Sequence, residues 1–120
     1  MKKVLIADDS VYHRTLLSAI LKKKNIELDM ASDGDEAVEK FKTFSPDLVF
    51  LDIMMPKSNG FEALKKMKEI KPDIVCIILS VLSSSDDVHK AKDSGADGYL
   101  LKPFESEKIN GVLKKFKIIE

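Results

Sequence analysis

The chain has 120 residues, enough for one domain with a real hydrophobic core and no need of disulfides or structural metals. Lysine plus arginine and aspartate plus glutamate number 20 each, so no excess charge favours nucleic acid or a membrane surface as a partner. No apolar stretch reaches the ~20 residues that cross a bilayer, and no signal peptide precedes the first apolar run. Cys76 is the single cysteine, which excludes an internal disulfide. We therefore expect one domain, residues 1–120, in the cytoplasm.

Apolar runs alternate with helical stripes five times along the chain. The runs predict strands at 3–7, 27–31, 48–51, 74–79 and 99–101, and the alternating 27–31 is expected at a sheet edge. The first helix is expected at about 12–24, and the stripe of the fourth helix is the weakest. The stripes expected to be buried are Leu16-Leu17-Ile20-Leu21, Ala37-Val38-Phe41-Phe44, Phe61-Leu64-Met67-Ile70, Val88-Ala91 and Ile109-Val112-Leu113-Phe116.

Capping and breaking residues predict where several of these helices begin and end. Asp33 is expected to cap the second helix, and the run 83–85 of three serines the fourth. Ser45-Pro46 is expected to stop the second helix and Gly95 to close the fourth.

Five β/α units joined by short connections predict an α/β fold with a parallel sheet and helices on both faces. Right-handed crossovers leave few topologies. We expect the flavodoxin-like (βα)5 doubly wound sheet with strand order 2-1-3-4-5.

Polar side chains stand at the end of four of the five predicted strands. Asp8 and Asp9 follow the first strand and Asp52 ends the third. Ser80 follows the fourth strand and Lys102 the fifth. In the expected order these residues meet at one edge of the sheet, where open α/β folds place their chemistry. Three carboxylates so close need a cation or raised pKa values, and Mg²⁺ is the hard, oxygen-bound ion expected there.

These residues also carry a family resemblance that extends over essentially the whole chain. The chain resembles the response-regulator receiver domain of two-component signalling, specifically the chemotaxis-type single-domain receiver. Each matching segment is weak alone, but the ordered set at these spacings is specific. The segments are Asp8-Asp9, Asp52 with Met55-Pro56 and Gly60, Ser80, and Tyr99-Leu100-Leu101-Lys102-Pro103-Phe104.

The resemblance implies that a histidine kinase or phosphotransfer protein passes a phosphoryl group to Asp52. It also implies that Asp9, Asp52 and the backbone carbonyl of Met54 bind Mg²⁺, with Asp8 helping through water. Catalysis of such a transfer is mainly positioning and charge stabilisation. The resemblance does not make the chain an enzyme in its own right.

Three further roles come from the same resemblance. Ser80 and Lys102 are expected to hold phosphoryl oxygens, and Tyr99 to turn inward as a switch. The face made by the fourth helix, fifth strand and fifth helix would then signal to a downstream target protein. The peptide bond between Lys102 and Pro103 is expected to be cis.

Other functional classes fit the residues less well. A haloacid-dehalogenase-type phosphatase uses a strand-end aspartate with Mg²⁺ but needs a second acid where Met54 stands. An FMN-binding flavodoxin needs a phosphate loop, and Asp8-Asp9-Ser10 would repel a phosphate. A purely structural interaction module gives no reason for the acidic cluster.

The organisation of the full protein and its oligomeric state are the remaining questions for the sequence. The chain is either a stand-alone receiver, which we favour, or the receiver segment of a longer regulator with an effector domain. We expect a monomer, because the fifth helix lacks the arginine that would pair with Asp97 across a dimer.

The remaining residues of interest fall into two groups. One group is interpreted as lying outside the site, and the other as affecting how long the phosphoryl group survives. His13 and His89 are interpreted as solvated helix residues, and Cys76 as a small core residue. The apolar Met54 and Leu82 lie at positions that in the family orient an attacking water. With the bulky Val81 they predict slow loss of the phosphoryl group.

Overall fold

The computed structural model describes residues 1–55, 60–81 and 85–119. Its five parallel strands form one sheet in the order β2-β1-β3-β4-β5, which confirms the predicted flavodoxin-like topology. The short β2 lies at an edge, as its alternating pattern predicted. The strands are β1 (Lys3–Ala7), β2 (Glu27–Ala31), β3 (Leu48–Asp52), β4 (Val75–Ser80) and β5 (Gly98–Leu101).

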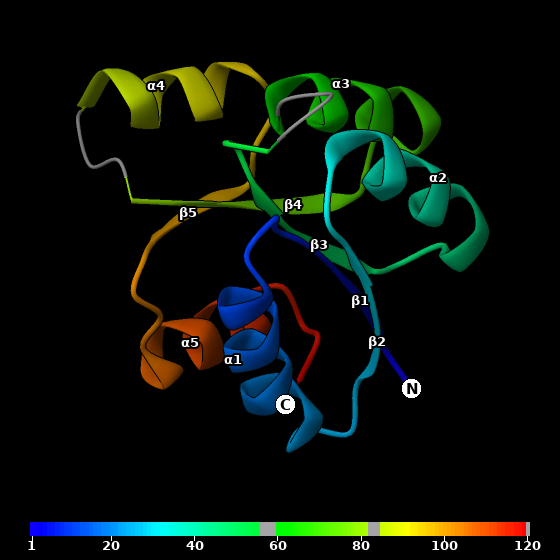
Figure 1. The fold of residues 1–120 in the computed structure, drawn as a ribbon, viewed down its shortest axis with the longest axis vertical. Helices are drawn as coiled ribbons and strands as arrows, with labels where there is room; N and C mark the ends of the chain where they lie inside the picture. Colours follow the sequence, from blue (N-terminus) through cyan, green and yellow to red (C-terminus); the bar gives the residue numbers. More distant parts are fainter. Residues whose placement is uncertain (56–59, 82–84, 120) are drawn as a thin grey trace.

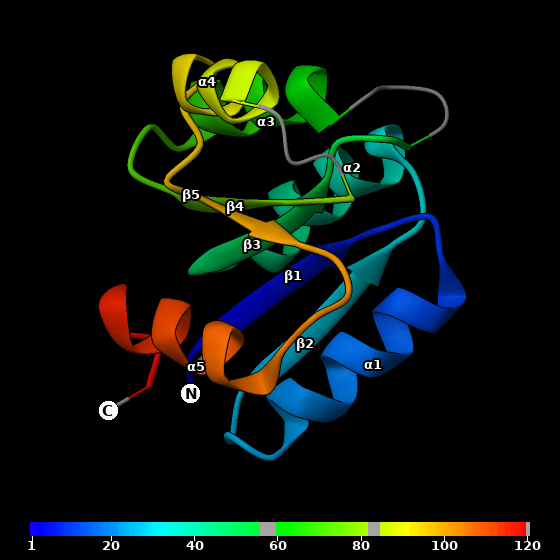
Figure 2. The ribbon, with the colours of Figure 1, turned by 90° about the vertical axis from the view of Figure 1, so that its left-hand side faces the viewer.

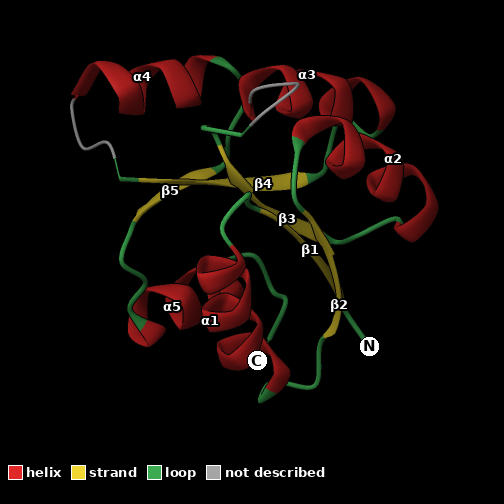
Figure 3. Cartoon of the chain, in the orientation of Figure 1, coloured by secondary structure: helices red, strands yellow, loops and turns green. Residues whose placement is uncertain are grey.

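Helices cover both faces of the sheet in three layers (Figures 1 and 2). The helices α1 and α5 lie against one face, while α2, α3 and α4 lie against the other. Helices and strands alternate along the chain, joined by short loops (Figure 3). The bounds are α1 (Val11–Lys22), α2 (Gly34–Phe44), α3 (Gly60–Ile70), α4 (Ser85–Asp93) and α5 (Ser106–Lys115).

The sheet separates two hydrophobic cores because its central strands are apolar on both faces. In β1, Leu5 packs with the α2–α3 side and Ile6 with the α1–α5 side. All five residues of β3 are buried. This is the arrangement expected of a strand in the middle of a parallel sheet. Its last residue, Asp52, therefore lies at the carboxyl edge of the sheet and is still buried.

Local sequence signals account for most helix boundaries. The side chain of Asp33 accepts a hydrogen bond from the Glu36 N–H and caps α2, as predicted. Ser45 ends that helix in the left-handed region with φ 52°. Gly95, with φ 99°, follows the end of α4. The predicted serine cap of α4 includes Ser83 and Ser84, which lie outside the described residues.

The structure corrects the predicted first and third helices. The expected helix at about 12–24 runs from Val11 to Lys22, because Ser10 caps its first turn and the chain reverses near Asn25 at φ 56°. Ile70, expected in the buried stripe of α3, is 47% exposed. It is the last residue of α3, whose buried side chains are Ala63, Leu64 and Met67.

The structure bears out only one of the two core residues predicted for the fourth helix. Ala91 is buried, but Val88 is 40% exposed. Cys76 is fully buried in β4, and burial raises the pKa of its thiol to about 12. Among the described residues, no helix has the length and apolar character needed to span a bilayer.

Candidate functional site

Three carboxylates meet at the carboxyl edge of the sheet because β1 and β3 are neighbours. The pairing of Ala7 with Leu51 places the residues that follow β1 beside the end of β3. Asp8, Asp9 and Asp52 each offer an oxygen, and these atoms lie within 4.8 Å of one another. Asp8 is fully buried and Asp52 is 4% exposed, whereas Asp9 is exposed. The predicted convergence of the three acids is therefore confirmed.

The turn after β3 is fixed by backbone contacts to Asp52 and Gly60. The Met54 N–H donates to Oδ1 of Asp52 at 3.0 Å, while the Met54 side chain is 62% exposed. The Gly60 N–H donates to the Ile53 carbonyl at 3.1 Å. A Cβ on Gly60 would lie 2.4 Å from Cα of Ile53, so only glycine fits there. Pro56, part of the same predicted motif, lies outside the described residues.

Lys102 joins the acids from the other side of the site. Its Nζ lies 2.7 Å from Oδ2 of Asp8 and 3.1 Å from Oδ2 of Asp52, and its side chain is 6% exposed. The Lys102 N–H donates to the Ser80 carbonyl at 2.8 Å, which ties the end of β5 to the end of β4. Its peptide bond to Pro103 is cis, as expected. One ammonium therefore bridges two buried carboxylates.

The pKa of Asp52 is raised above the ordinary value for an aspartate. Burial is the largest cause, because it removes water from the charged carboxylate. The hydrogen bond from the Met54 N–H opposes this shift, the charge of Asp8 adds to it, and Lys102 opposes it. The carboxylate is thus held in a setting that favours a further cation beside it.

The donor set fits a hard divalent cation. Oδ2 of Asp8 is fully buried and accepts no directed hydrogen bond within the described part of the chain. The nearby Lys102 Nζ meets it only as an ion pair. Carboxylate oxygens at this spacing, one of them lacking a directed donor, suit Mg²⁺.

The interpretation of His13 as a solvated helix residue is wrong. Because Ser10 caps α1 by accepting from the His13 N–H, the first helical turn lies over the edge of the sheet. Nδ1 of His13 is 3.2 Å from Nζ of Lys102 and 3.8 Å from Oδ2 of Asp8. Its ring also meets Phe104 edge to face, with centroids 5.7 Å apart.

Arg14 is the second residue near the site that the sequence pattern did not single out. Its guanidinium donates to the backbone carbonyl of Asp8 and so holds the loop that carries the acids. The sequence signal that could have placed both residues near the site was Ser10 as a helix cap. Residues three and four positions beyond a cap lie on the first helical turn.

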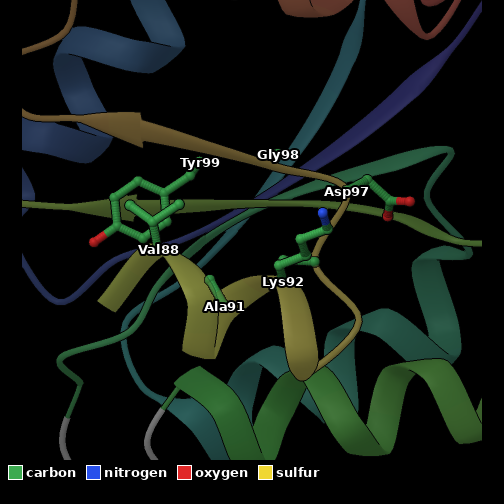
Figure 4. Close-up of a pocket in the computed structure, with 7 residues that line it drawn as sticks. Val88, Ala91, Lys92, Asp97, Gly98 and Tyr99 are labelled. Carbon is green, nitrogen blue, oxygen red and sulfur yellow. The ribbon is translucent and has the colours of Figure 1, made fainter. Parts of the chain in front are cut away.

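Ser80 and Tyr99 lie on the β4–β5 side of the site. Ser80 is buried at the end of β4, one residue beyond the partner of Asp52 in the β3–β4 register. Tyr99 is half-buried, and its ring lies beside Val88 in a hollow of about 270 Å³ between α4 and β5 (Figure 4). Asp97, at the other end of this hollow, pairs with Lys68 at 3.0 Å.

Comparison with known proteins decides the family. The family model described as "Response regulator receiver domain" matches residues 4–114. The chain belongs to this family. This receiver domain is 40% identical over 108 residues to the chemotaxis protein CheY of Halobacterium salinarum, covering 90% of each chain.

Solved structures agree with that assignment. CheY4 of Vibrio cholerae has a TM-score of 0.91 at 31% identity, over 97% of this chain and 98% of that one. CheY in the CheX–CheY–BeF3–Mg²⁺ complex from Borrelia burgdorferi has a TM-score of 0.90 at 34% identity, over 96% of this chain and 89% of that one. This chain is a receiver domain of two-component signalling, and it shares the fold of these chemotaxis proteins.

Proposed function

We propose that this receiver domain accepts a phosphoryl group on Asp52 from a phosphohistidine. The observation that carries the proposal is the position of Asp52. It is a buried strand-end carboxylate with a raised pKa, 3.1 Å from the Lys102 ammonium and beside two further acids. A nucleophile in that position needs positive charge around it before an anionic donor approaches.

The two oxygens of Asp52 have different surroundings. Oδ1 accepts from the Met54 N–H, and Oδ2 faces Lys102. In the proposed step one carboxylate oxygen attacks the phosphorus of the donor. The P–O bond forms as the P–N bond breaks, and the electron pair returns to the donor imidazole, which takes up a proton. The group transferred is the phosphoryl group alone, and the product is an acyl phosphate.

The remaining site residues bind and orient the group. Bound to Asp9, Asp52 and the Met54 carbonyl, with Asp8 helping through water, Mg²⁺ would neutralise charge on the phosphoryl oxygens. Lys102 is placed to donate to one of those oxygens as a compact point charge. The hydroxyl of Ser80 supplies a second donor from the adjacent strand end. A relative, CheY of Borrelia burgdorferi, has been solved in a complex with BeF3 and Mg²⁺, which supports this assignment.

The proposed output lies on the face made by α4, β5 and α5. If Ser80 moves toward the new phosphoryl group, the space it leaves can receive the Tyr99 ring. The Tyr99 ring lines the hollow between α4 and β5, and among the described side chains of α4 only Ala91 is buried. We propose a histidine kinase or phosphotransfer protein as donor, and a target protein that reads this face. The relative bound to CheX shows that proteins of this family do take protein partners.

A small phosphodonor tests the proposal without knowledge of the kinase. Acetyl phosphate with Mg²⁺ should produce one acyl phosphate per chain in the parent, measured by phosphorus NMR. Asp52→Asn should give no signal, and removing Mg²⁺ with a chelator should slow the reaction at least about a hundredfold. Equal labelling of parent and Asp52→Asn would contradict the proposal.

A further inference from the structure

The ammonium of Lys102 has three polar neighbours among the described residues. Two are the carboxylates of Asp8 and Asp52, at 2.7 and 3.1 Å. The third is Nδ1 of His13, at 3.2 Å, and it is a neutral acceptor rather than an acid. Lys102 therefore makes two directed hydrogen bonds, to Asp52 and to His13, and one ion pair, to Asp8.

We propose that His13 is a positioning residue that holds Lys102 at the phosphoacceptor site. Its imidazole accepts a hydrogen bond from Lys102 through Nδ1 and keeps the ammonium directed at Asp52. The inference rests on the proposed function, because it assigns His13 a part in phosphorylation of Asp52. The contact that carries it is the 3.2 Å pair of Nζ and Nδ1 between α1 and the end of β5.

The direction of this bond follows from the chemistry of the two groups. Lys102 donates, so Nδ1 of His13 holds its lone pair toward Lys102 and the ring proton stays on Nε2. The ring is held in this orientation by its neighbours. Its backbone N–H is bound by the Ser10 cap, and its ring makes edge-to-face contacts with Tyr12 and Phe104, with ring centroids 5.5 and 5.7 Å away.

The need for such a residue follows from competition within the acid cluster. Asp8 and Asp52, which attract Lys102, are also two of the three carboxylates that suit a cation. A cation in that cluster weakens their hold on Lys102, whose long side chain loses rotamer entropy when it is fixed. His13 stands outside the three-acid cluster. It therefore keeps Lys102 in place when the carboxylates are engaged elsewhere.

A spectroscopic test needs neither Mg²⁺ nor phosphorylation. Nitrogen NMR of the metal-free protein should give His13 an unprotonated, hydrogen-bonded Nδ1 and a protonated Nε2. His89, exposed in α4 with no polar contact to a described residue, serves as the reference ring and should give the averaged signals of a solvated imidazole. Lys102→Met should then move the Nδ1 signal of His13 but leave His89 unchanged. An Nδ1 that is protonated, or that ignores Lys102→Met, overturns the inference.

Two variants of His13 test the consequence for phosphorylation. His13→Asn retains an acceptor close to the place of Nδ1, whereas His13→Leu keeps a similar volume and removes the acceptor. With acetyl phosphate and Mg²⁺, we expect His13→Leu to slow labelling of Asp52 about tenfold, and His13→Asn to stay within about twofold of the parent. His89→Leu is the control and should match the parent. Acetyl phosphate avoids any kinase that contacts α1, so the rates report on the site itself.

The outcomes separate the inference from the proposed function. If the parent is not labelled on Asp52, both fail. If the parent is labelled and His13→Leu reacts as fast, the proposed function stands and the role of His13 is wrong. If His13→Asn is as slow as His13→Leu, the ring's packing rather than its acceptor nitrogen matters, and the inference is again overturned.

Discussion

Asp52 is buried, and it carries a carboxylate whose negative charge burial disfavours. It lies at the end of a fully buried strand, and its carboxylate is 4% exposed beside that of Asp8. The burial that raises its pKa also makes its charged form costly in the folded state. The same burial strengthens the attraction between this carboxylate and nearby positive charges. A residue suited to accept a phosphoryl group is thus a local source of instability until a cation is bound.

The first prediction concerns the stability of the metal-free protein. Since the folded pKa of Asp52 lies above its unfolded value, the ionised group lowers the free energy of unfolding above the folded pKa. Asp52→Asn should therefore raise that free energy at neutral pH, in urea unfolding with a chelator present. The gain should shrink as pH falls through the folded pKa and vanish below the unfolded pKa of about 3.9.

The control for this measurement is Asp73→Asn. Asp73 is exposed between α3 and β4 and should leave the stability within about 0.5 kcal/mol of the parent. If Asp52→Asn lowers the free energy of unfolding at neutral pH, the attraction between Asp52 and Lys102 outweighs the cost of burying the Asp52 charge. That result would contradict the prediction.

A second prediction concerns how long the phosphoryl group survives. Met54 follows Asp52 by two residues and Val81 follows Ser80 directly, and both are exposed, at 62% and 67%, on the side from which water reaches the chain. Leu82 lies outside the described residues, and its contribution is argued from its position in the sequence. Met54→Asn with Leu82→Glu should shorten the phosphorylated lifetime about tenfold, because polar groups can orient the water.

The readout is loss of phosphorylated protein with time, in Mg²⁺ and without partners. Val81→Ala should separately speed labelling by a small donor, since it widens access. A parent that loses its phosphate as fast as the double variant would show that apolar shielding does not set the lifetime.

At the level of elements, the close packing of Gly60 against the end of β3 fixes where α3 begins beside the site. Gly60 begins α3 so close to the backbone of Ile53 that a methyl group has no room. Gly60→Ala should lower the free energy of unfolding by about 2 kcal/mol or more, measured in urea.

Gly111→Ala is the matched control, because a Cβ there meets nothing within 4 Å. It lies in the middle of α5 and should instead add about 0.5–1 kcal/mol. Equal effects of the two changes would mean that the close approach at Gly60 is relieved at little cost.

The strands and the acidic cluster were predictable because their signals are local and repeated. The apolar run that ends at Asp52 indicates both a buried central strand and a carboxylate at the sheet edge. The weak stripe of the fourth helix was a poorer guide, because Val88 was expected in the core and is 40% exposed. The exposure of Ile70 was not visible in a periodic pattern, which continues past the edge of the core.

The Ser10 cap places His13 on the first turn of α1, but the sequence does not assign its role. Its role depends on a contact with Lys102, which lies 89 positions away in the chain. Periodicity places His13 on a helix, but it does not say that the first turn of α1 reaches the end of β5. Only the packing of α1 over the sheet edge brings the two together.

At the scale of the whole molecule, cation binding and stability are linked. Mg²⁺ that binds only the folded chain should raise the free energy of unfolding by about 2.7 kcal/mol at a concentration a hundred times its Kd. A thermal melt across millimolar Mg²⁺ measures this as a rise in Tm. Asp9→Asn should weaken the response more than Asp8→Asn, because Asp9 is the proposed direct ligand. A Tm that does not move with Mg²⁺ would argue against the site.

The central claim is that Asp52, and no other group in this cluster, takes the phosphoryl group. The most direct measurement is mass-spectrometric mapping of the protein after acetyl phosphate treatment, without restriction to any residue type. We expect one modified peptide, in which the phosphoryl group lies on Asp52 and its formation depends on Mg²⁺. Phosphate found on His13, Asp8 or Asp9 of the parent, or found equally without Mg²⁺, would contradict it.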